Sequence, residues 1–224
     1  MKHAVIIRFH YPKDHQKFEW RLAYFQAIVL PSLLRQNNKN FDICVWCNEW
    51  HRERIQNLSP RIKTFDVKPE AWGYIKPGYE EKAKRFHVDF VEWEKVVGLE
   101  KYDIQTAVDS DDIILRKDFI DRIEQECKTA KGSLHLSFQP YMFHVPTLTT
   151  YTCPVPYKMS YGSPFYSIYQ PNKEKFIFAY HDSHLKMSKY MKESRIIEVG
   201  YCTFSVHSKN ESTYLYRAAK KIML

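Results

Sequence analysis

The sequence predicts an α/β fold in which helices cover a mostly parallel sheet. In the first half of the chain, short apolar segments alternate with segments whose apolar residues recur every three or four positions, which gives the order β-α-β-α-β-α-β-α. Strands and helices that alternate in this way build parallel sheets with helices on both faces. The chain has 224 residues, 44% of them apolar and 16% aromatic, so it can bury a full core and is not disordered.

Each element of the first half follows from its own pattern. Four runs are short, apolar and rich in β-branched or aromatic residues, and we expect buried strands at 4–9, 41–47, 62–67 and 104–108. Helical spacing of the apolar residues predicts helices at 18–34, 53–58, 80–97 and 119–127. Because Pro31 has no backbone N–H and its ring disturbs the preceding turn, the first of these helices should kink or restart there.

The second half of the chain has a different pattern. Between residues 134 and 169, apolar and polar residues alternate irregularly, and five prolines stand among many tyrosines. These features predict loops and short strands. No linker, internal repeat or low-complexity segment divides the chain, so we expect a single domain over residues 1–224.

The charge balance favours anionic partners. The chain carries 34 Lys and Arg residues against 26 Asp and Glu residues, and its formal net charge is +8. A basic protein attracts polyanions, so nucleic acid, anionic lipid and nucleotide diphosphates are all candidate partners on charge alone.

The cysteines and the apolar segments indicate a cytoplasmic protein. The five cysteines are scattered and odd in number, so we expect reduced thiols rather than a disulfide framework. Cys44 and Cys47 have the spacing of a metal-binding pair, but residues i and i+3 of a strand point to opposite faces, and we interpret both as structural. No apolar run reaches the length of a signal peptide or a transmembrane helix, so any membrane contact would be peripheral.

The most informative segment is acidic and follows the fourth predicted strand. Asp109, Asp111 and Asp112 fall within four residues. Carboxylates suit Mg²⁺ or Mn²⁺, and the carboxyl ends of parallel strands are where open α/β sheets bind ligands. A divalent ion held there would bridge to a substrate diphosphate. The alternatives are a solvated turn that caps the next helix and a calcium loop, which is disfavoured because Ile114 stands where an EF-hand needs glycine.

Several segments, in the right order, resemble one superfamily. Residues 107–114 and the following Asp118-Phe119 resemble the DxD motif region of GT-A glycosyltransferases, and residues 32–43 resemble the junction between a helix and the second strand in those enzymes. More narrowly, the chain is similar to the rhamnosyltransferase family in Arg8-Phe9, the turn at 30–33, the acidic motif and the segment 207–212. The resemblance extends from about residue 4 to residue 213.

The resemblance implies a fold, an activity and a cofactor. It implies a single GT-A-like, Rossmann-like domain in which residues 1–112 bind the nucleotide sugar and residues 113–224 bind the acceptor. The implied activity is metal-dependent transfer of a sugar, rhamnose by the family name, from a nucleotide diphosphate sugar to a carbohydrate acceptor. The implied cofactor is Mn²⁺ or Mg²⁺.

The resemblance also implies a set of metal ligands at the acidic segment. Asp109 would contact the ribose or the metal, Asp111 would be the principal metal ligand, and Asp112 would assist it. His207 would be a second protein ligand or a phosphate contact, although a structural histidine is the ordinary interpretation of such a residue.

Four further residues are expected near the nucleotide. The resemblance places Arg8 and His10, at the end of the first strand, beside the nucleotide, and it implies that Lys84 and Arg85 reach the diphosphate from a helix. For the three basic side chains the alternative is an ordinary surface charge, at a strand end or on a solvated helix face.

Transfer with inversion needs a carboxylate that takes the proton of the acceptor hydroxyl. Asp182, Glu174 and Glu198 are the candidates in the second half, and we favour Asp182 because it lies in a polar cluster between aromatic segments. A group of aromatic residues would either stack on sugar rings or be ordinary half-buried side chains: Trp72, Tyr157, Tyr161, Tyr166 and Tyr169.

Two other classes of function stay open. A non-catalytic sugar-nucleotide or glycan-binding module would bind the same ligands without turnover. A nucleic-acid-binding protein would use basic charge and aromatic stacking, but the basic runs are no longer than pairs and no RRM, KH or zinc-finger pattern is present. We therefore expect a nucleotide sugar and a glycan as partners, and no nucleic acid.

Overall fold

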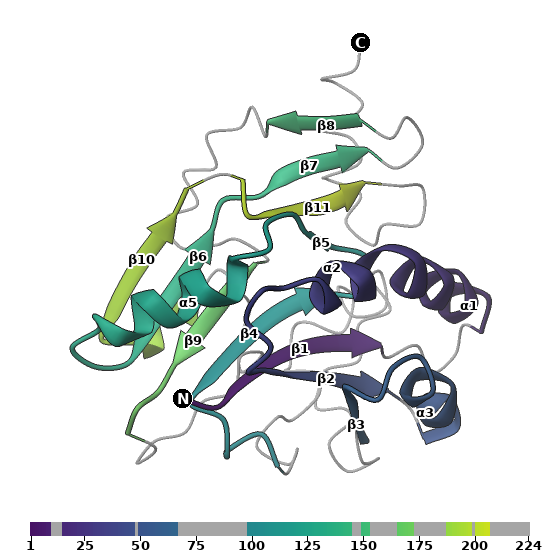
Figure 1. Cartoon of the computed structure of the whole chain (residues 1–224), viewed down its shortest axis with the longest axis horizontal. Helices are drawn as coiled ribbons and strands as arrows, with labels where there is room; N and C mark the ends of the chain where they lie inside the picture. Colours follow the sequence, from purple (N-terminus) through teal and green to yellow (C-terminus); the bar gives the residue numbers. More distant parts are fainter. Residues whose placement is uncertain are drawn as a thin grey trace, which may run out of the picture.

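The computed structural model describes most of the first half of the chain and the central strands of the second. The described residues are 1–9, 15–47, 49–66, 98–144, 149–152, 165–172, 187–198 and 200–206. They form a seven-stranded sheet, a four-stranded sheet and a set of helices that pack on the larger sheet (Figure 1). The predicted helix at 80–97 and residues 207–224 lie outside the described residues.

The seven-stranded sheet is the centre of the fold. Its strands, in spatial order, are β10 (Glu193–Ile197), β6 (Leu134–Phe138), β9 (Tyr166–Tyr169), β4 (Ile104–Asp109), β1 (His3–Phe9), β2 (Asp42–Cys47) and β3 (Ile62–Asp66). β4, β1, β2 and β3 pair in parallel, as do β10 and β6, while β9 is antiparallel to both of its neighbours. The predicted α/β fold with a mostly parallel sheet is therefore confirmed.

The second half of the chain forms short strands, as its sequence pattern predicts, and these strands are organised into two sheets. Three of its strands, β6, β9 and β10, complete the central sheet. A second sheet has the order β5 (Ile113–Ile114), β11 (Cys202–Val206), β7 (Tyr141–His144) and β8 (Thr149–Thr152). β5 begins directly after the acidic segment, so this segment lies where the two sheets meet (Figure 1).

The helices follow the predicted pattern with two informative differences. α1 (His15–Tyr24) continues into a π-helical turn, η1 (Phe25–Val29), and then into α2 (Leu30–Leu34), which has Pro31 in its first turn. Val29 and Leu30 both keep right-handed helical angles, so the helix continues through this junction and changes from π-helical to α-helical hydrogen bonding one residue before Pro31. α3 (Glu49–Gln56) begins four residues earlier than the predicted start at residue 53. The reason is that His51 is buried with Ile55 on the inner face, and a histidine does not register in an apolar pattern.

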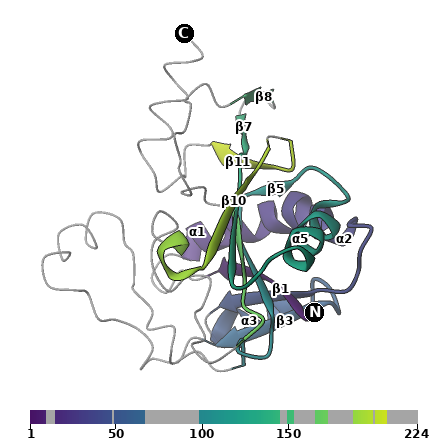
Figure 2. The ribbon, with the colours of Figure 1, turned by 90° about the vertical axis from the view of Figure 1, so that its left-hand side faces the viewer.

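Two apolar clusters cover the two faces of the central sheet. In β1, Val5 and Ile7 belong to a cluster that also contains side chains of α1, α2, α3 and α5 (Phe119–Lys128). Ala4 and Ile6 belong to the opposite cluster, which includes Met187 of the short helix η6 (Met187–Tyr190). Figure 2, turned by 90°, shows the central sheet nearly on edge. None of the helices in the described part of the chain has the length and apolar character needed to cross a membrane.

The cysteine pair of β2 fits this arrangement. Cys47 lies in the cluster on the helix side and Cys44 in the opposite cluster, as the strand geometry predicts. Both thiols are free and buried. Burial raises the pKa of Cys44 to about 12 and that of Cys47 to about 12, so both stay protonated at neutral pH and neither is prepared to bind a metal.

Candidate functional site

The site is defined by the point where the order of the parallel strands changes direction. From β1 the chain proceeds to β2 and β3 on one side of the sheet, whereas β4 pairs with β1 on the other side. Open α/β sheets bind ligands outside the carboxyl ends of the strands at such a switch point. The relevant strand ends are therefore those of β1 and β4.

Two accessible charged side chains stand at these ends. Arg8 of β1 and Asp109 of β4 are register partners in the parallel pairing. Nη2 of Arg8 donates to Oδ1 of Asp109 at 3.2 Å, and the two side chains are 47% and 38% exposed. The other residues of β1 and β4 are buried. Arg8 and Asp109 are therefore the accessible polar residues of these two strands.

Tyr166 of β9 pairs with Ala107 of β4 and interacts electrostatically with both members of this pair. Burial raises the pKa of its hydroxyl, with Arg8 lowering it and Asp109 raising it by their charges. The side chain is 2% exposed, so Tyr166 is a core aromatic and not a sugar-stacking surface. Tyr169 is partly buried against the helix-side cluster.

The other two acidic residues of this segment are not accessible to a ligand in the way that Asp109 is. Asp111 and Asp112 are buried, in contrast with Asp109. Asp111 forms an ion pair with Arg21 of α1. The backbone N–H of Asp112 donates to the carbonyl of Asp109 at 3.1 Å, which closes the turn after β4. Only Asp109, of these three carboxylates, is offered to solvent.

The helix before β2 is fastened to the segment that follows the acidic turn. The hydroxyl of Ser32 accepts a hydrogen bond from the backbone N–H of Ile114 at 3.3 Å. Arg35 donates to the carbonyl of Leu115 at 2.7 Å, and the side-chain amide of Gln36 donates to the next carbonyl at 2.8 Å. These bonds place the Ser32–Gln36 segment beside the residues that follow the acidic turn.

The predicted metal ligands, Asp109, Asp111 and Asp112, differ in their accessibility to an ion. Carboxylate oxygens are the right donors for Mg²⁺ or Mn²⁺. However, Asp111 already faces the guanidinium of Arg21, and Asp112 is buried. Within the described ranges, no three His, Cys, Asp or Glu side chains come together to hold a metal ion. The described residues therefore do not fit a site in which Asp109, Asp111 and Asp112 bind one ion together.

The structure places some of the predicted site residues and leaves others outside its described part. It brings Arg8 and Asp109 together and separates them, by burial, from Asp111 and Asp112. Glu198 is exposed and directly follows β10. The remaining predicted residues lie outside the described residues: His10, Trp72, Lys84, Arg85, Tyr157, Tyr161, Glu174, Asp182 and His207.

Arg21 is the site residue that sequence reasoning missed. It lies three residues after Phe18 and four before Phe25, so it falls on the apolar face of the first helix. Both aromatic side chains are fully buried. A charged residue on the buried face of a helix needs an opposite charge nearby. The position of Arg21 between two apolar residues therefore indicates a buried ion pair from the sequence alone.

The mostly parallel sheet, with the accessible pair at its switch point, defines this protein as an α/β protein with a GT-A-like fold. The sequence model of the family described as "Putative rhamnosyl transferase" matches residues 3–218, and the chain belongs to this family. Among curated proteins, none matches the chain.

Solved structures show the same fold at low sequence identity. The chain is similar to S. aureus TarS 1-349 in complex with UDP-GlcNAc, with 16% identity, a TM-score of 0.56 and coverage of 99% of this chain and 65% of that one. It is also similar to S. aureus TarS 1-349 in complex with UDP, with 16% identity, a TM-score of 0.51 and coverage of 92% of this chain and 61% of that one. The chain thus spans somewhat less than two thirds of these structures.

Proposed function

We propose that this protein transfers a sugar from a nucleotide diphosphate sugar to a carbohydrate acceptor. The observation that carries the proposal is the accessible Arg8–Asp109 pair at the carboxyl ends of β1 and β4, where α/β sheets bind ligands. Membership of a glycosyltransferase family supports it. The similar TarS structures, which hold UDP-GlcNAc and UDP, support a nucleotide sugar as the donor.

The two side chains have complementary tasks towards such a donor. The guanidinium of Arg8 has a planar set of N–H donors that matches phosphate oxygens, so it is suited to hold the diphosphate. The carboxylate of Asp109 is an acceptor and is suited to the hydroxyl groups of a ribose. When the donor enters, the 3.2 Å bond between the two side chains would be exchanged for bonds to the donor.

A divalent ion remains a prediction from the sequence. Bound Mn²⁺ or Mg²⁺ would supply positive charge at a departing diphosphate. Because Asp111 is paired with Arg21, we assign no reaction step to the ion and propose Asp109 as the described carboxylate that is accessible to it.

The transfer itself forms one bond and breaks one. The acceptor oxygen attacks the anomeric carbon, the bond from that carbon to the diphosphate breaks, and the nucleoside diphosphate leaves with the bonding electrons. For transfer with inversion we propose Asp182 as the base that takes the hydroxyl proton. We propose His10, Lys84, Arg85 and His207 as further contacts of the nucleotide or its phosphates.

The sugar and the acceptor are the least constrained parts of the proposal. The family name makes an activated rhamnose the first donor to examine. The acceptor is proposed to be a glycan, bound by the second half of the chain. No feature of the described residues selects one hexose over another.

The proposal is tested by a thermal-shift screen followed by a turnover assay. The parent protein is heated with UDP-, GDP- and dTDP-linked sugars, each with and without Mn²⁺, and any stabilising donor is then assayed for release of the nucleoside diphosphate. Asp109→Asn should lower donor turnover at least about tenfold, because it removes a charged contact to the donor.

The matched control is Asp121→Asn, which makes the same change at an exposed carboxylate on α5. It should leave both binding and turnover unchanged. Stabilisation by a donor without turnover would favour the sugar-nucleotide-binding module instead. If no donor stabilises the protein under any condition, the proposed function is wrong.

A further inference from the structure

One carboxylate of the acidic turn forms a buried ion pair with a side chain from a different element. The guanidinium of Arg21, on α1, pairs with the carboxylate of Asp111. The two side chains are only 6% and 7% exposed. Since Phe18 and Phe25 flank Arg21 on the same face of the helix, the pair is surrounded by the apolar core on that side.

The turn therefore places its carboxylates in different surroundings, one accessible and one buried. Asp109 is 38% exposed and faces Arg8 at the strand ends, whereas Asp111 is turned inward to Arg21. The Asp112 N–H bond to the carbonyl of Asp109 fixes the backbone between them. The direction in which Asp109 points thus depends on the conformation of the turn, and the buried pair is one of the contacts that fix this conformation.

The energetics of burial keep the pair together. A charge that is taken out of water is stable only beside an opposite charge, so Asp111 loses its compensation if it turns outward and leaves Arg21 behind. A divalent ion brought to Asp111 from outside would approach the guanidinium and be repelled by it. This arrangement opposes the role of principal metal ligand that the family resemblance implies for Asp111.

We infer that Arg21 is a positioning residue that holds Asp111 inside the protein, so that Asp109 is the carboxylate presented to the donor. The inference rests on the proposed function for the identity of that ligand, but the arrangement of the three side chains stands independently of it. Arg21 touches neither the donor nor the reacting atoms in this assignment and acts through the turn.

The first experiment reads the arrangement without any ligand. The intact folded chain is treated with a carbodiimide and glycine ethyl ester, and the labelled carboxylates are quantified by tandem mass spectrometry. In the parent, Asp109 should label at least about tenfold faster than Asp111, because labelling requires solvent access. Arg21→Gln should raise the labelling of Asp111 and leave Asp121, on α5, unchanged.

The second experiment separates positioning from simple stability. Arg21→Gln should lower kcat for donor turnover by about tenfold with a smaller change in KM, because the turn loses its fixed geometry. Arg21→Gln/Asp111→Asn removes both charges and keeps a hydrogen-bonding pair, and it should restore at least part of kcat. Arg21→Lys, which keeps the charge, should rescue more of kcat than Arg21→Gln.

The outcomes distinguish this inference from the proposed function. If Asp111 labels as fast as Asp109 in the parent, or if the double variant has lower kcat than Arg21→Gln, the inference is overturned. If no donor is turned over by the parent while the labelling follows the expected order, the proposed function fails and the buried position of Asp111 stands. Since the comparison within the parent needs no variant, misfolding of a variant does not prevent the test.

Discussion

Lys63 pairs with Asp42 at the amino ends of β3 and β2, with 2.5 Å between Nζ and Oδ2. This pair resembles the Arg8–Asp109 pair in composition and in exposure, since the side chains of Lys63 and Asp42 are 50% and 32% exposed. The two pairs lie at opposite ends of the parallel strands. Because ligands bind at the carboxyl ends of such strands, the sheet offers the proposed donor-binding pair and a matched pair at the opposite end in one molecule.

The first prediction uses this match. Arg8→Gln should weaken binding of a nucleoside diphosphate about tenfold, or about 1.4 kcal/mol, because it removes a charged donor to phosphate. Lys63→Gln removes an equally exposed cation at the opposite end of the sheet and should leave the affinity unchanged. Titration calorimetry with UDP and GDP at two salt concentrations measures both variants. Equal losses in the two variants would indicate general electrostatic attraction rather than a site.

The second prediction concerns acid stability. His3 and His135 are buried in the central sheet, and burial lowers the pKa of His3 to about 3 and that of His135 to about 4. His3 also shares a 2.7 Å hydrogen bond with the hydroxyl of Thr106. Below the ordinary pKa of 6.5 the unfolded chain binds protons that the folded chain does not, so the free energy of unfolding should fall as the pH falls.

The expected slope is at most about 1.4 kcal/mol per pH unit for each histidine, over the range from about pH 6.5 down to about pH 4. Urea denaturation at several pH values measures it. His3→Gln/His135→Gln should flatten the curve in this range. Three carboxylates with a lowered pKa, Asp42, Asp118 and Glu193, also begin to lose their contribution below about pH 5, but the parent and the double variant share them, so the difference between the two curves reports the histidines. An unchanged slope in the double variant would contradict this assignment.

The strands and helices of the first half could be predicted because each one buries a periodic apolar face. The strand at Ile104–Asp109 and the helix at Phe119–Lys128 were predicted within one residue of their observed ends. The membership of β6 and β9 in the central sheet could not be predicted, because pairing between distant strands leaves no local signal. β9 is antiparallel to both neighbours, which an alternating β-α order does not indicate.

The candidate site was only partly predictable for a similar reason. The acidic motif marks where the strand ends, but the direction of each carboxylate depends on residues far away in the sequence. Asp109 is exposed because its partner Arg8 lies at a strand end, and Asp111 is buried because Arg21 meets it from a helix. These pairings come from the three-dimensional arrangement, and a run of three acidic residues does not contain them.

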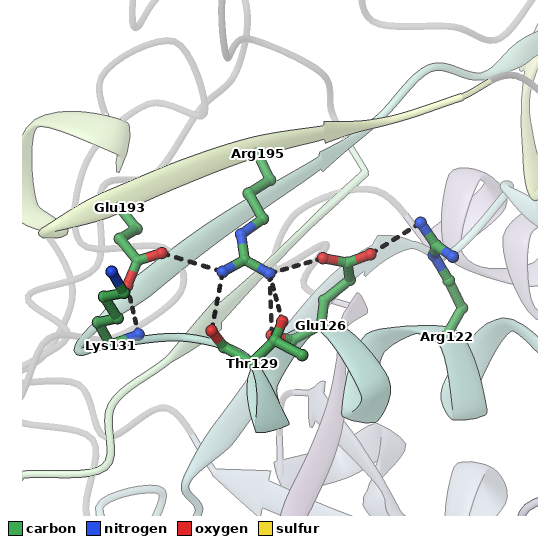
Figure 3. Close-up of polar contacts among 6 residues, drawn as sticks. All are labelled: Arg122, Glu126, Thr129, Lys131, Glu193 and Arg195. Atoms are coloured by element: carbon green, nitrogen blue, oxygen red, sulfur yellow. Dashed lines mark hydrogen bonds and ion pairs between the residues drawn. The ribbon is translucent and has the colours of Figure 1, made fainter.

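The third prediction concerns the contact between α5 and β10. Figure 3 shows Arg195 of β10 between Glu126 and Glu193, with Arg122 on the far side of Glu126. Arg195 donates to the Glu126 carboxylate at 2.8 Å and to the Thr129 hydroxyl at 2.6 Å, and it also reaches the carbonyls of both residues at the end of the helix.

Arg195→Ala should lower the free energy of unfolding by about 1–2 kcal/mol, because it leaves Glu126 with one partner and the helix end without its donor. Arg122→Ala removes a single helical ion pair and should cost about 0.3–0.5 kcal/mol. Arg195→Lys should fall between the parent and Arg195→Ala, since an ammonium cannot make all of these bonds. Denaturation in urea ranks the variants, and equal costs for the two alanine variants would refute the proposed role of Arg195.

The fourth prediction concerns Gln36, which is fully buried between α2 and α5. Its amide donates to the carbonyls of Ser32 at 3.1 Å and Arg116 at 2.8 Å, and its oxygen accepts from the N–H of Ile120 at 3.4 Å. Gln36→Leu leaves buried backbone groups without this partner and should cost about 2–4 kcal/mol of unfolding free energy. Gln36→Glu should also be destabilising, because a carboxylate cannot donate to the two carbonyls.

Gln56 is the matched control, because it is exposed on α3 and Gln56→Leu should change the free energy of unfolding by less than about 0.5 kcal/mol. Gln36 also helps to fix the segment that follows the acidic turn, so Gln36→Leu should weaken nucleoside diphosphate binding as well as stability. Denaturation and calorimetry on the same preparations test both effects. Loss of stability with unchanged affinity would mean that the acidic turn keeps its conformation without the hydrogen bonds of Gln36.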